Sequence, residues 1–249
     1  MAHPISVTIL VKNGQKHIER CLTSLREFDE VIVLDNESTD RTVEMAAAFP
    51  NVKIFTSEFL GIGKLKNLAA QHATHDWIFN IDCDEVLTRE AVEEIQRLTL
   101  KENCIYSLPR KNFYREKHIK CCGWYPDRVL RLYNRRHASY NDCLVHASIV
   151  SAGTSQIIPL THAIEHFSFH SASDFLDKTQ SYAKLFAVEN RGRRKSSPLK
   201  AVSHACFSFL KNYFLQKGFL YGYVGLLISV SNANGVFYKY MMLYEEDLK

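Results

Sequence analysis

The first hundred residues alternate short apolar runs with amphipathic segments, and this alternation restricts the possible folds most. The apolar runs, rich in Val and Ile, are 5–11, 30–35, 52–55 and 77–82. Segments with helical spacing of apolar residues follow them at 18–28, 40–49, 62–73 and 89–98. Strands that alternate with helices predict a mostly parallel sheet flanked by helices, and nearly continuous apolar strands predict burial on both faces. We therefore predict an α/β fold.

The remainder of the chain has a different pattern. Short strands separated by basic loops are expected at 104–110, 128–133, 147–152 and 155–160. From Ser171 the pattern is helical, with Ser and Asp at the positions that cap a helix, and 191–198 is expected to be a basic linker between helices. A length of 249 residues favours one α/β domain with an appendage.

Composition places the chain among globular proteins, with 46% hydrophobic and 23% charged residues. The net charge of +4 is unevenly distributed. Residues 106–140 carry nine Lys or Arg against two acidic residues, and residues 184–217 carry eight against Glu189. This bias indicates an anionic partner, which could be a phosphate group, a nucleic acid or an anionic membrane face.

Cysteine usage and hydropathy bear on the compartment. The seven Cys are odd in number and include no C-x-x-C pair, which favours neither a disulfide framework nor a zinc site. The first strand begins too early to leave room for a signal peptide, and the longest apolar run, 219–230, is shorter than the ~20 residues of a membrane span. We expect a cytoplasmic protein.

Polar residues follow the predicted strands where ligands bind in α/β sheets. Lys12–Gly14, Asp35–Asp40 and Asp82–Glu85 each come directly after an apolar run. In an extended chain, Asp82 and Asp84 would face the same side and could clamp Mg²⁺ or Mn²⁺. The alternative is a solvated turn or a helix cap. The segment 61–67, GIGKLKN, resembles a dinucleotide fingerprint only weakly, because it does not follow the first strand and ends in Asn67.

Four segments in order resemble the family 2 glycosyltransferases of the A-type fold. They are TILVKNG, EVIVLDNESTDRT, GKLKNLAAQHATHDWIFNIDCDEV and CGWYPDRVLRLYNR. The later stretches HFSFHSASDFLDKTQSYAKLFA, FLKNYFLQKGFLYG and GVFYKYMML look like bacterial lipopolysaccharide core β-1,4-glucosyltransferases that act on inner-core heptose. The resemblance implies inverting transfer of a hexose, with glucose expected, from a UDP-sugar to a lipopolysaccharide or lipooligosaccharide core acceptor.

The same resemblance implies a division of the chain. Residues 1–168 would form the catalytic domain, with a nucleotide-sugar-binding half at 1–100 and an acceptor half at 101–168. Residues 169–249 would form a helical C-terminal extension.

The resemblance to the family also implies roles for individual residues, by their positions in the matching motifs. Asp35 matches the acidic residue that binds uracil, Lys66 and Asn67 match a pair that holds the nucleotide, Asp82 faces the ribose and metal, and Asp84 ligates the metal. The nucleotide-sugar site expected from the resemblance comprises Val11, Asn13, Asp35, Lys64, Lys66, Asn67, Asp82, Cys83 and Asp84. The Mg²⁺ or Mn²⁺ site would comprise Asp84, Asp82 and His146.

Asp127 matches the region that supplies the catalytic base. The attacking hydroxyl must lose a proton, and a single displacement inverts the anomeric carbon without a covalent intermediate. The alternative for Asp127 is an ion pair with Arg128 or Arg131.

Acceptor contacts are expected from the basic segment 110–136. Trp124 could stack on a sugar ring, and Arg110, Arg128 and Arg131 could bind phosphates or acidic sugars of the acceptor. The alternatives are a core tryptophan and a solvated basic face. His146 and His166 either touch the diphosphate or metal or are structural.

The C-terminal segment combines Lys200, Lys211 and Lys217 with aromatic residues, which suits peripheral contact with the anionic inner membrane. The alternative is a helical cap on the sheet.

Two other functions stay open. A sugar-nucleotide pyrophosphorylase shares the α/β plan, although 11–17, VKNGQKH, lacks the Gly-rich loop that such an enzyme needs. A non-catalytic member would fit Ala147, since relatives usually carry His-Glu where this chain has His146-Ala147. A nucleic-acid partner is not expected, because no nucleic-acid module is recognised.

Overall fold

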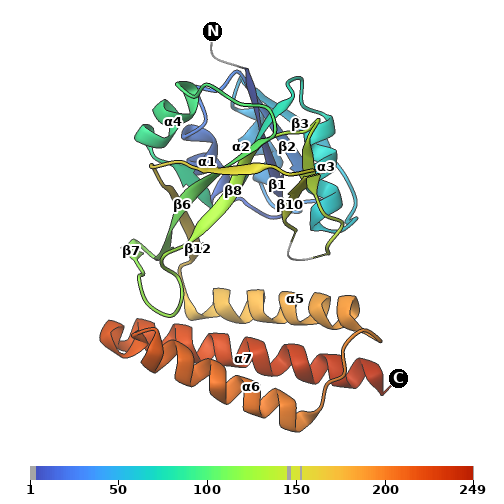
Figure 1. The fold of residues 1–249 in the computed structure, drawn as a ribbon, viewed down its shortest axis with the longest axis vertical. Coiled ribbons are helices and arrows are strands. Elements are labelled where there is room, and N and C mark those ends of the chain that lie inside the picture. The colour runs from blue at the N-terminus through green and yellow to red at the C-terminus, as the bar shows by residue number, and fades with distance from the viewer. Residues whose placement is uncertain (1–3, 145–146, 152, 249) are drawn as a thin grey trace. The chain divides into compact units, whose positions relative to one another are not determined.

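A computed structural model describes residues 4–144, 147–151 and 153–248 (Figure 1). The chain forms two compact units, each built from two segments. Unit 1 comprises Met1–Lys111 and Asp127–His166, and unit 2 comprises Asn112–Pro126 and Phe167–Lys249. The sheet belongs mainly to unit 1, and long helices dominate unit 2.

The sheet of unit 1 has a parallel part and an antiparallel part. The parallel strands β1 (Ile5–Val11), β2 (Glu30–Asp35), β3 (Val52–Thr56) and β4 (Trp77–Asp82) lie in the order β3-β2-β1-β4. The order continues through β8 (Arg128–Asn134), β6 (Cys104–Tyr114), β12 (Ile164–Phe169) and β5 (Glu85–Leu87), with β8 antiparallel to both β4 and β6. Shorter strands are β7 (Lys117–His118), β9 (Ala138–Tyr140), β10 (Ile149–Ser151) and β11 (Gln156–Pro159).

Both faces of β1, β2 and β4 are buried, as their continuous apolar runs predict, whereas the edge strand β3 is only partly buried. Along β2, Val33 belongs to one apolar cluster with Ile18 and Leu22, whereas its neighbour Leu34 packs with Leu65 on the opposite face. Successive side chains of a strand point to opposite faces, so helices α1 (Ile18–Thr23) and α3 (Ile62–Gln71) cover different sides of the sheet.

The helices of unit 1 are shorter than the sequence pattern indicates. Helix α1 stops at Thr23, and Leu25 and Phe28 reach the same core from the turns that follow it. Helix α2 covers Thr42–Ala47 and α4 covers Arg89–Gln96. The hydroxyl of Thr88 accepts a hydrogen bond from the Ala91 amide and caps the first turn of α4.

Unit 2 contains three long helices. Helix α5 (Ala172–Asn190) begins with a capping box in which Ser171 and Asp174 exchange hydrogen bonds, as the sequence predicts. Helix α6 (Pro198–Leu210) continues into a π-helical turn, η1 (Lys211–Leu215), then a 3₁₀ turn, η2 (Gly218–Tyr221), and helix α7 (Gly222–Asp247). Helix α7 lies between α5 and α6 (Figure 1). Within the described residues, none of the helices is long and apolar enough to cross a membrane.

Candidate functional site

The carboxyl ends of the parallel strands bring together residues that are distant in the sequence. Val11 pairs with Asp35 across β1 and β2, and Leu10 pairs with Asp82 across β1 and β4. Asp35 and Asp82 therefore lie on either side of the end of β1, at the edge where α/β sheets bind ligands.

Asp35 is almost fully buried at the end of β2. Its Oδ2 accepts a hydrogen bond from the Ser38 amide at 3.0 Å, whereas its buried Oδ1 has no partner among the described residues. A buried acceptor without a donor costs free energy, so a ligand N–H at this edge would be stabilised by Oδ1.

Asn13 ties the loops after β1 and β2 to each other. Its side-chain Oδ1 accepts a hydrogen bond from the backbone N–H of Thr39, and its backbone N–H donates to Ser38 Oγ, both at 2.8 Å. Its backbone has a φ of 53°, a left-handed conformation that Asn tolerates better than most residues. Asn13 thus fixes the loop that borders Asp35.

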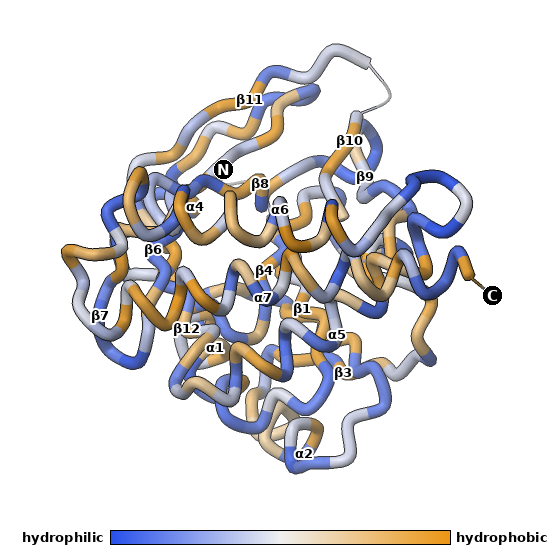
Figure 2. The backbone as a smooth tube through the Cα atoms, turned by 90° about the horizontal axis from the view of Figure 1, so that it is seen from below, coloured by the Kyte–Doolittle hydropathy of each residue, from blue (hydrophilic) through white to orange (hydrophobic). Residues whose placement is uncertain are grey.

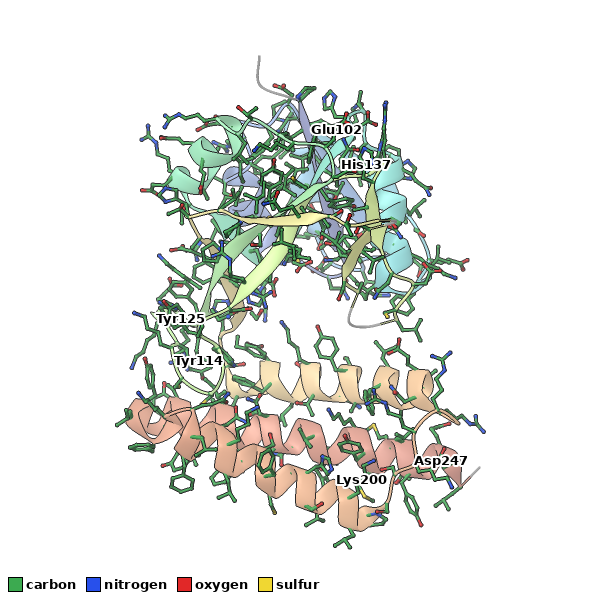
Figure 3. All side chains as sticks on the ribbon, viewed as in Figure 1. Glu102, Tyr114, Tyr125, His137, Lys200 and Asp247 are labelled. Atoms are coloured by element: carbon green, nitrogen blue, oxygen red, sulfur yellow. The ribbon has the colours of Figure 1, made fainter. Side chains whose placement is uncertain are left out.

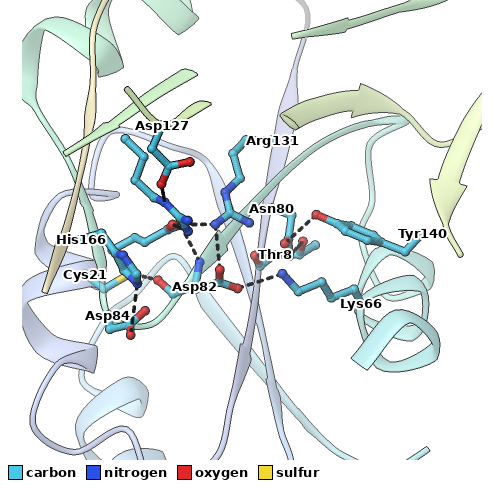
Figure 4. A network of polar contacts seen from close by, with 12 residues as sticks. Thr8, Cys21, Lys66, Asn80, Asp82, Asp84, Asp127, Arg131, Tyr140 and His166 are labelled. Carbon is cyan, nitrogen blue, oxygen red and sulfur yellow. Dashed lines mark hydrogen bonds and ion pairs between the residues drawn. The ribbon is translucent and has the colours of Figure 1, made fainter. Parts of the chain in front are cut away.

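Two cations hold the Asp82 carboxylate (Figure 4). Lys66 Nζ lies 2.8 Å from Oδ1, and an Arg131 guanidinium nitrogen lies 2.7 Å from Oδ2. Burial alone would raise the pKa of Asp82, but the charges of Arg131 and Lys66 outweigh burial and hold this pKa far below its usual value. Asp82 is therefore ionised, and both its oxygens are engaged.

Glu85 extends this network towards Asp127. The Glu85 side chain is fully buried, and its Oε1 accepts from Arg131 at 2.5 Å and from Arg110 at 3.2 Å. Its Oε2 accepts from the Asp82 amide at 3.1 Å. Arg110 Nε donates to Asp127 Oδ2 at 2.8 Å. Charges of alternating sign thus run from Lys66 to Asp127 without interruption.

Asp84 separates from Asp82 because the chain does not stay extended. Strand β4 ends at Asp82, residues 83–84 form a turn, and β5 starts at Glu85. The expectation of one two-aspartate clamp on an extended segment is therefore corrected. Asp84 Oδ2 lies 3.4 Å from His166 Nε2, which comes from β12. The partly buried Cys83 lies at the same turn, with its Sγ next to Gly14.

The residues fit a hard divalent cation at Asp84 rather than at Asp82. No group of three or more His, Cys, Asp or Glu in the described part of the chain is arranged to hold a metal. Mg²⁺ and Mn²⁺ sites in phosphate chemistry commonly use one or two protein ligands, with substrate phosphates and water completing the shell. A carboxylate beside an imidazole is such a donor set, whereas Asp82 is already neutralised by two cations.

The side chains of Asn67 and Lys64, which both lie on α3, have different environments. The side chain of Asn67 exchanges two hydrogen bonds of 2.8 Å with the backbone of Tyr140, and the Tyr140 hydroxyl donates to Asn80 Oδ1 at 2.9 Å. Asn67 thus positions β9 against α3, while Lys64 is exposed on the same helix.

The predicted acceptor residues fall into different environments. Arg110 and Arg131 belong to the buried network, and Arg128 donates to the backbone carbonyls of Ser107 and Leu160. In unit 2, Trp124 stacks on Phe169, with ring centroids 5.5 Å apart. His146 lies outside the described residues, while Ala147 is partly buried against an apolar cluster.

Sequence reasoning missed the role of Glu85 and named the wrong arginine as a partner for Asp127. Asp127 pairs with Arg110, whereas Arg131 pairs with Asp82 and Glu85. Glu85 directly follows the acidic triplet in the sequence, so its position gave a signal, but only the fold shows it between two arginines.

Comparisons with known proteins agree with this geometry. The glycosyl transferase family 2 pattern matches residues 6–149, more than half of the chain. An uncharacterized glycosyltransferase of Rickettsia typhi is 28% identical over 258 residues, which cover 98% of this chain and 88% of the relative. The lipopolysaccharide core biosynthesis glycosyltransferase LpsC of Rhizobium meliloti is 23% identical over 253 residues, covering 97% and 92%.

A solved structure confirms the predicted fold. The mannosyltransferase PcManGT from Pyrobaculum calidifontis, in complex with GDP-Man and Mn²⁺, matches with a TM-score of 0.53 at 14% identity, covering 100% of this chain and 88% of that one. The chain therefore belongs to glycosyl transferase family 2 and has the A-type α/β fold.

Proposed function

We propose that the protein transfers a hexose, glucose in the first instance, from a UDP-sugar to a lipopolysaccharide or lipooligosaccharide core acceptor with inversion. The observation that carries this proposal is the meeting of Asp35 and Asp82 at one edge of the sheet, with an Asp35 oxygen that has no partner among the described residues and with Asp84 in the turn after β4. Such an edge offers a hydrogen-bond acceptor for an N–H of the nucleobase and a binding site for a diphosphate and its cation.

The donor would lie along the carboxyl ends of β1, β2 and β4. Asp35 Oδ1 would accept the N3–H of uracil, which would satisfy the buried oxygen. Asp82 would face the ribose, with Lys66 and Arg131 fixing the orientation of its carboxylate. Val11, Asn13, Lys64, Asn67 and Cys83 complete the proposed donor site.

Asp84 would hold the divalent cation, with His166 at its side. When bound, Mg²⁺ or Mn²⁺ would stabilise the negative charge that develops on the departing diphosphate. Asp82, whose charge is balanced by Lys66 and Arg131, would lie beside this cation, and we retain Asp82 and His146 as candidate ligands.

Asp127 would act as the general base. Its carboxylate is partly exposed, and its Oδ2 accepts a hydrogen bond from Arg110 Nε at 2.8 Å. A carboxylate within hydrogen-bond reach of the acceptor hydroxyl can take its proton during attack. Only one displacement follows, so the anomeric configuration inverts.

The glycolipid acceptor is supported by the similarity to LpsC along nearly the whole chain, and by the basic residues of 106–140. The proposed acceptor contacts remain Trp124, Arg110, Arg128 and Arg131. The proposed catalytic domain is 1–168, and the proposed helical extension is 169–249. The cytoplasmic face of the inner membrane is the proposed site of action.

Replacement of Asp127 by Asn tests the base. We expect Asp127→Asn to bind UDP with unchanged affinity and to lose about 10²–10⁴-fold in transfer rate to purified core acceptor, since Asn cannot accept the proton. Asp76→Asn is the matched control, because Asp76 also pairs with arginines but lies at the amino-terminal end of β4. Normal transfer by Asp127→Asn would refute the base assignment, and absence of UDP binding by the unaltered protein would refute the proposed donor.

A further inference from the structure

An apolar stripe runs along the outer side of α6. Its members are exposed and recur at helical spacing, at positions i, i+3, i+7, i+11 and i+15: Leu199, Val202, Cys206, Leu210 and Phe214. In a helix of a globular protein such a stripe normally faces the core. Here Leu199 is 80% exposed and Leu210 is 52% exposed. The stripe therefore has no partner within the described residues.

The segment that follows α6 enlarges this apolar surface. Exposed apolar side chains continue through η1, η2 and the first turns of α7: Leu215, Phe219, Leu220, Tyr223 and Leu226. We call these residues and the α6 stripe the apolar face of unit 2. Figure 2 shows α6 with hydrophobic segments along its length. Large contiguous apolar surfaces of this kind mark interaction sites.

The segment that carries the apolar face is basic along its sequence, although Arg191 at its start pairs with Glu246 at 3.6 Å. Residues 190–244 contain no Asp or Glu, and they carry eight basic residues: Arg191, Arg193, Arg194, Lys195, Lys200, Lys211, Lys217 and Lys239. Lys200 lies on α6 itself (Figure 3). Basic side chains beside exposed Leu and Phe match a surface that combines acyl chains with anionic headgroups.

A cavity of about 360 Å³ opens between α6 and α7 on the flank of the stripe. Its lining includes Lys211, Lys239, His204 and Ser208 together with the apolar ring of Phe207. The two lysines form no ion pair with a carboxylate of the described chain. A cavity of this composition suits a phosphate group that enters from the adjoining surface.

We propose that the apolar face of unit 2 docks the protein onto an anionic phospholipid membrane, with Leu210 and Phe214 inserted among the acyl chains and the basic residues of 191–217 on the headgroups. The interaction goes beyond sugar transfer, since it requires neither a donor nor an acceptor sugar. It places the protein at the surface that displays lipid-linked substrates.

A second copy of the chain fits this face less well. A symmetric dimer would bring the same surface of both copies together. Lys200 and Lys211, which lie on α6 and η1, would then approach the same residues of the other copy. Like charges repel, so the charge pattern favours an anionic partner over a second copy.

Vesicle co-sedimentation of the full chain tests the proposal. We expect binding to phosphatidylcholine vesicles that contain phosphatidylglycerol, weaker binding to phosphatidylcholine alone, and loss of binding as salt increases. Leu210→Glu/Phe214→Glu should bind at least tenfold more weakly, because two inserted side chains are replaced by charges. Arg193→Gln/Arg194→Gln should lose about fivefold per residue on the anionic vesicles only.

The matched control is Ile157→Glu/Leu176→Glu. Ile157 and Leu176 are 56% and 66% exposed, comparable to Leu210 and Phe214, but lie on β11 and α5. This control should bind as the unaltered chain does. The proposal is overturned if the unaltered chain does not bind anionic vesicles, or if Leu210→Glu/Phe214→Glu binds them as well as the unaltered chain does. It is also overturned if sedimentation velocity shows that the unaltered chain is a dimer and this double variant is a monomer.

Discussion

The buried Glu85 offers a quantitative test of the charge network. Its carboxylate accepts hydrogen bonds from Arg131, Arg110 and the Asp82 amide. Glu85→Gln keeps the size of the side chain but removes its charge, and it turns one acceptor into an NH₂ group that faces another donor. Two buried guanidinium groups then share less negative charge. Removing one partner of a buried ion pair costs about 3–5 kcal/mol, and we expect this loss in the free energy of unfolding.

Chemical and thermal unfolding measure this cost. Trp77 lies in the core of unit 1, so its fluorescence in a Trp124→Phe background reports on the unit that contains Glu85. A loss of this size corresponds to a fall in Tm of roughly 10 °C for a domain of this size.

Glu93 provides a matched control. It also bridges two arginines, Arg89 at 3.1 Å and Arg97 at 3.2 Å, but on the exposed side of α4. Exposed ion pairs contribute about 0–1 kcal/mol, so Glu93→Gln should unfold almost as the unaltered protein does. Equal stability of Glu85→Gln and Glu93→Gln would refute the view that the buried network supports the site.

Two further predictions concern the scaffold of unit 1. Gly63→Ala should lose about 1–3 kcal/mol of unfolding free energy, because its Cβ would lie 1.7 Å from the backbone oxygen of Asn141. Gly153→Ala should be nearly neutral, because a Cβ at this position would have no neighbour within 4 Å. Equal urea midpoints of the two variants would contradict the prediction for Gly63. Glu30 should make unfolding pH-dependent: burial opposes ionisation, but bonds from Lys53, Ser6 and Thr74 lower its pKa from 4.5 to about 2. The resulting stabilisation, about 3 kcal/mol, is complete above pH 4.5 and is lost as the pH falls towards 2, so Glu30→Gln should flatten the stability profile between these values.

The parallel part of the fold could be predicted from the sequence because burial on both faces leaves a direct signal. Runs such as 5–11 and 30–35 are apolar throughout, and the structure gives both as strands with these bounds. The predicted helix ends were less accurate, because Leu25 and Phe28 keep the apolar spacing of a helix although they lie in the turns after α1.

The donor edge was predictable in outline because parallel strands end at a common edge. Polar residues were therefore expected along one edge of the sheet, and the register places Asp35 and Asp82 on either side of the end of β1. The turn at 83–84 was only an alternative at the level of the sequence, because a short polar segment after a strand has no periodicity that distinguishes extension from a turn.

The arginine network could not be predicted, since its members come from β5, β6 and β8. Which arginine meets which carboxylate depends on the register of antiparallel strands far apart in the sequence. The register sets Arg110 beside Asp127 and leaves Arg131 between Asp82 and Glu85.

Asp84 is proposed to bind the cation of a UDP-sugar donor after the end of β4, and calorimetric titration with UDP measures this binding. The unaltered protein should bind UDP more tightly with Mn²⁺ than without it, and Asp84→Ala should lose at least about tenfold of the Mn²⁺-dependent affinity. Asp29→Ala, an exposed aspartate just before β2, should bind as the unaltered protein does. Equal Mn²⁺-dependent UDP affinity of Asp84→Ala and the unaltered protein would contradict the account.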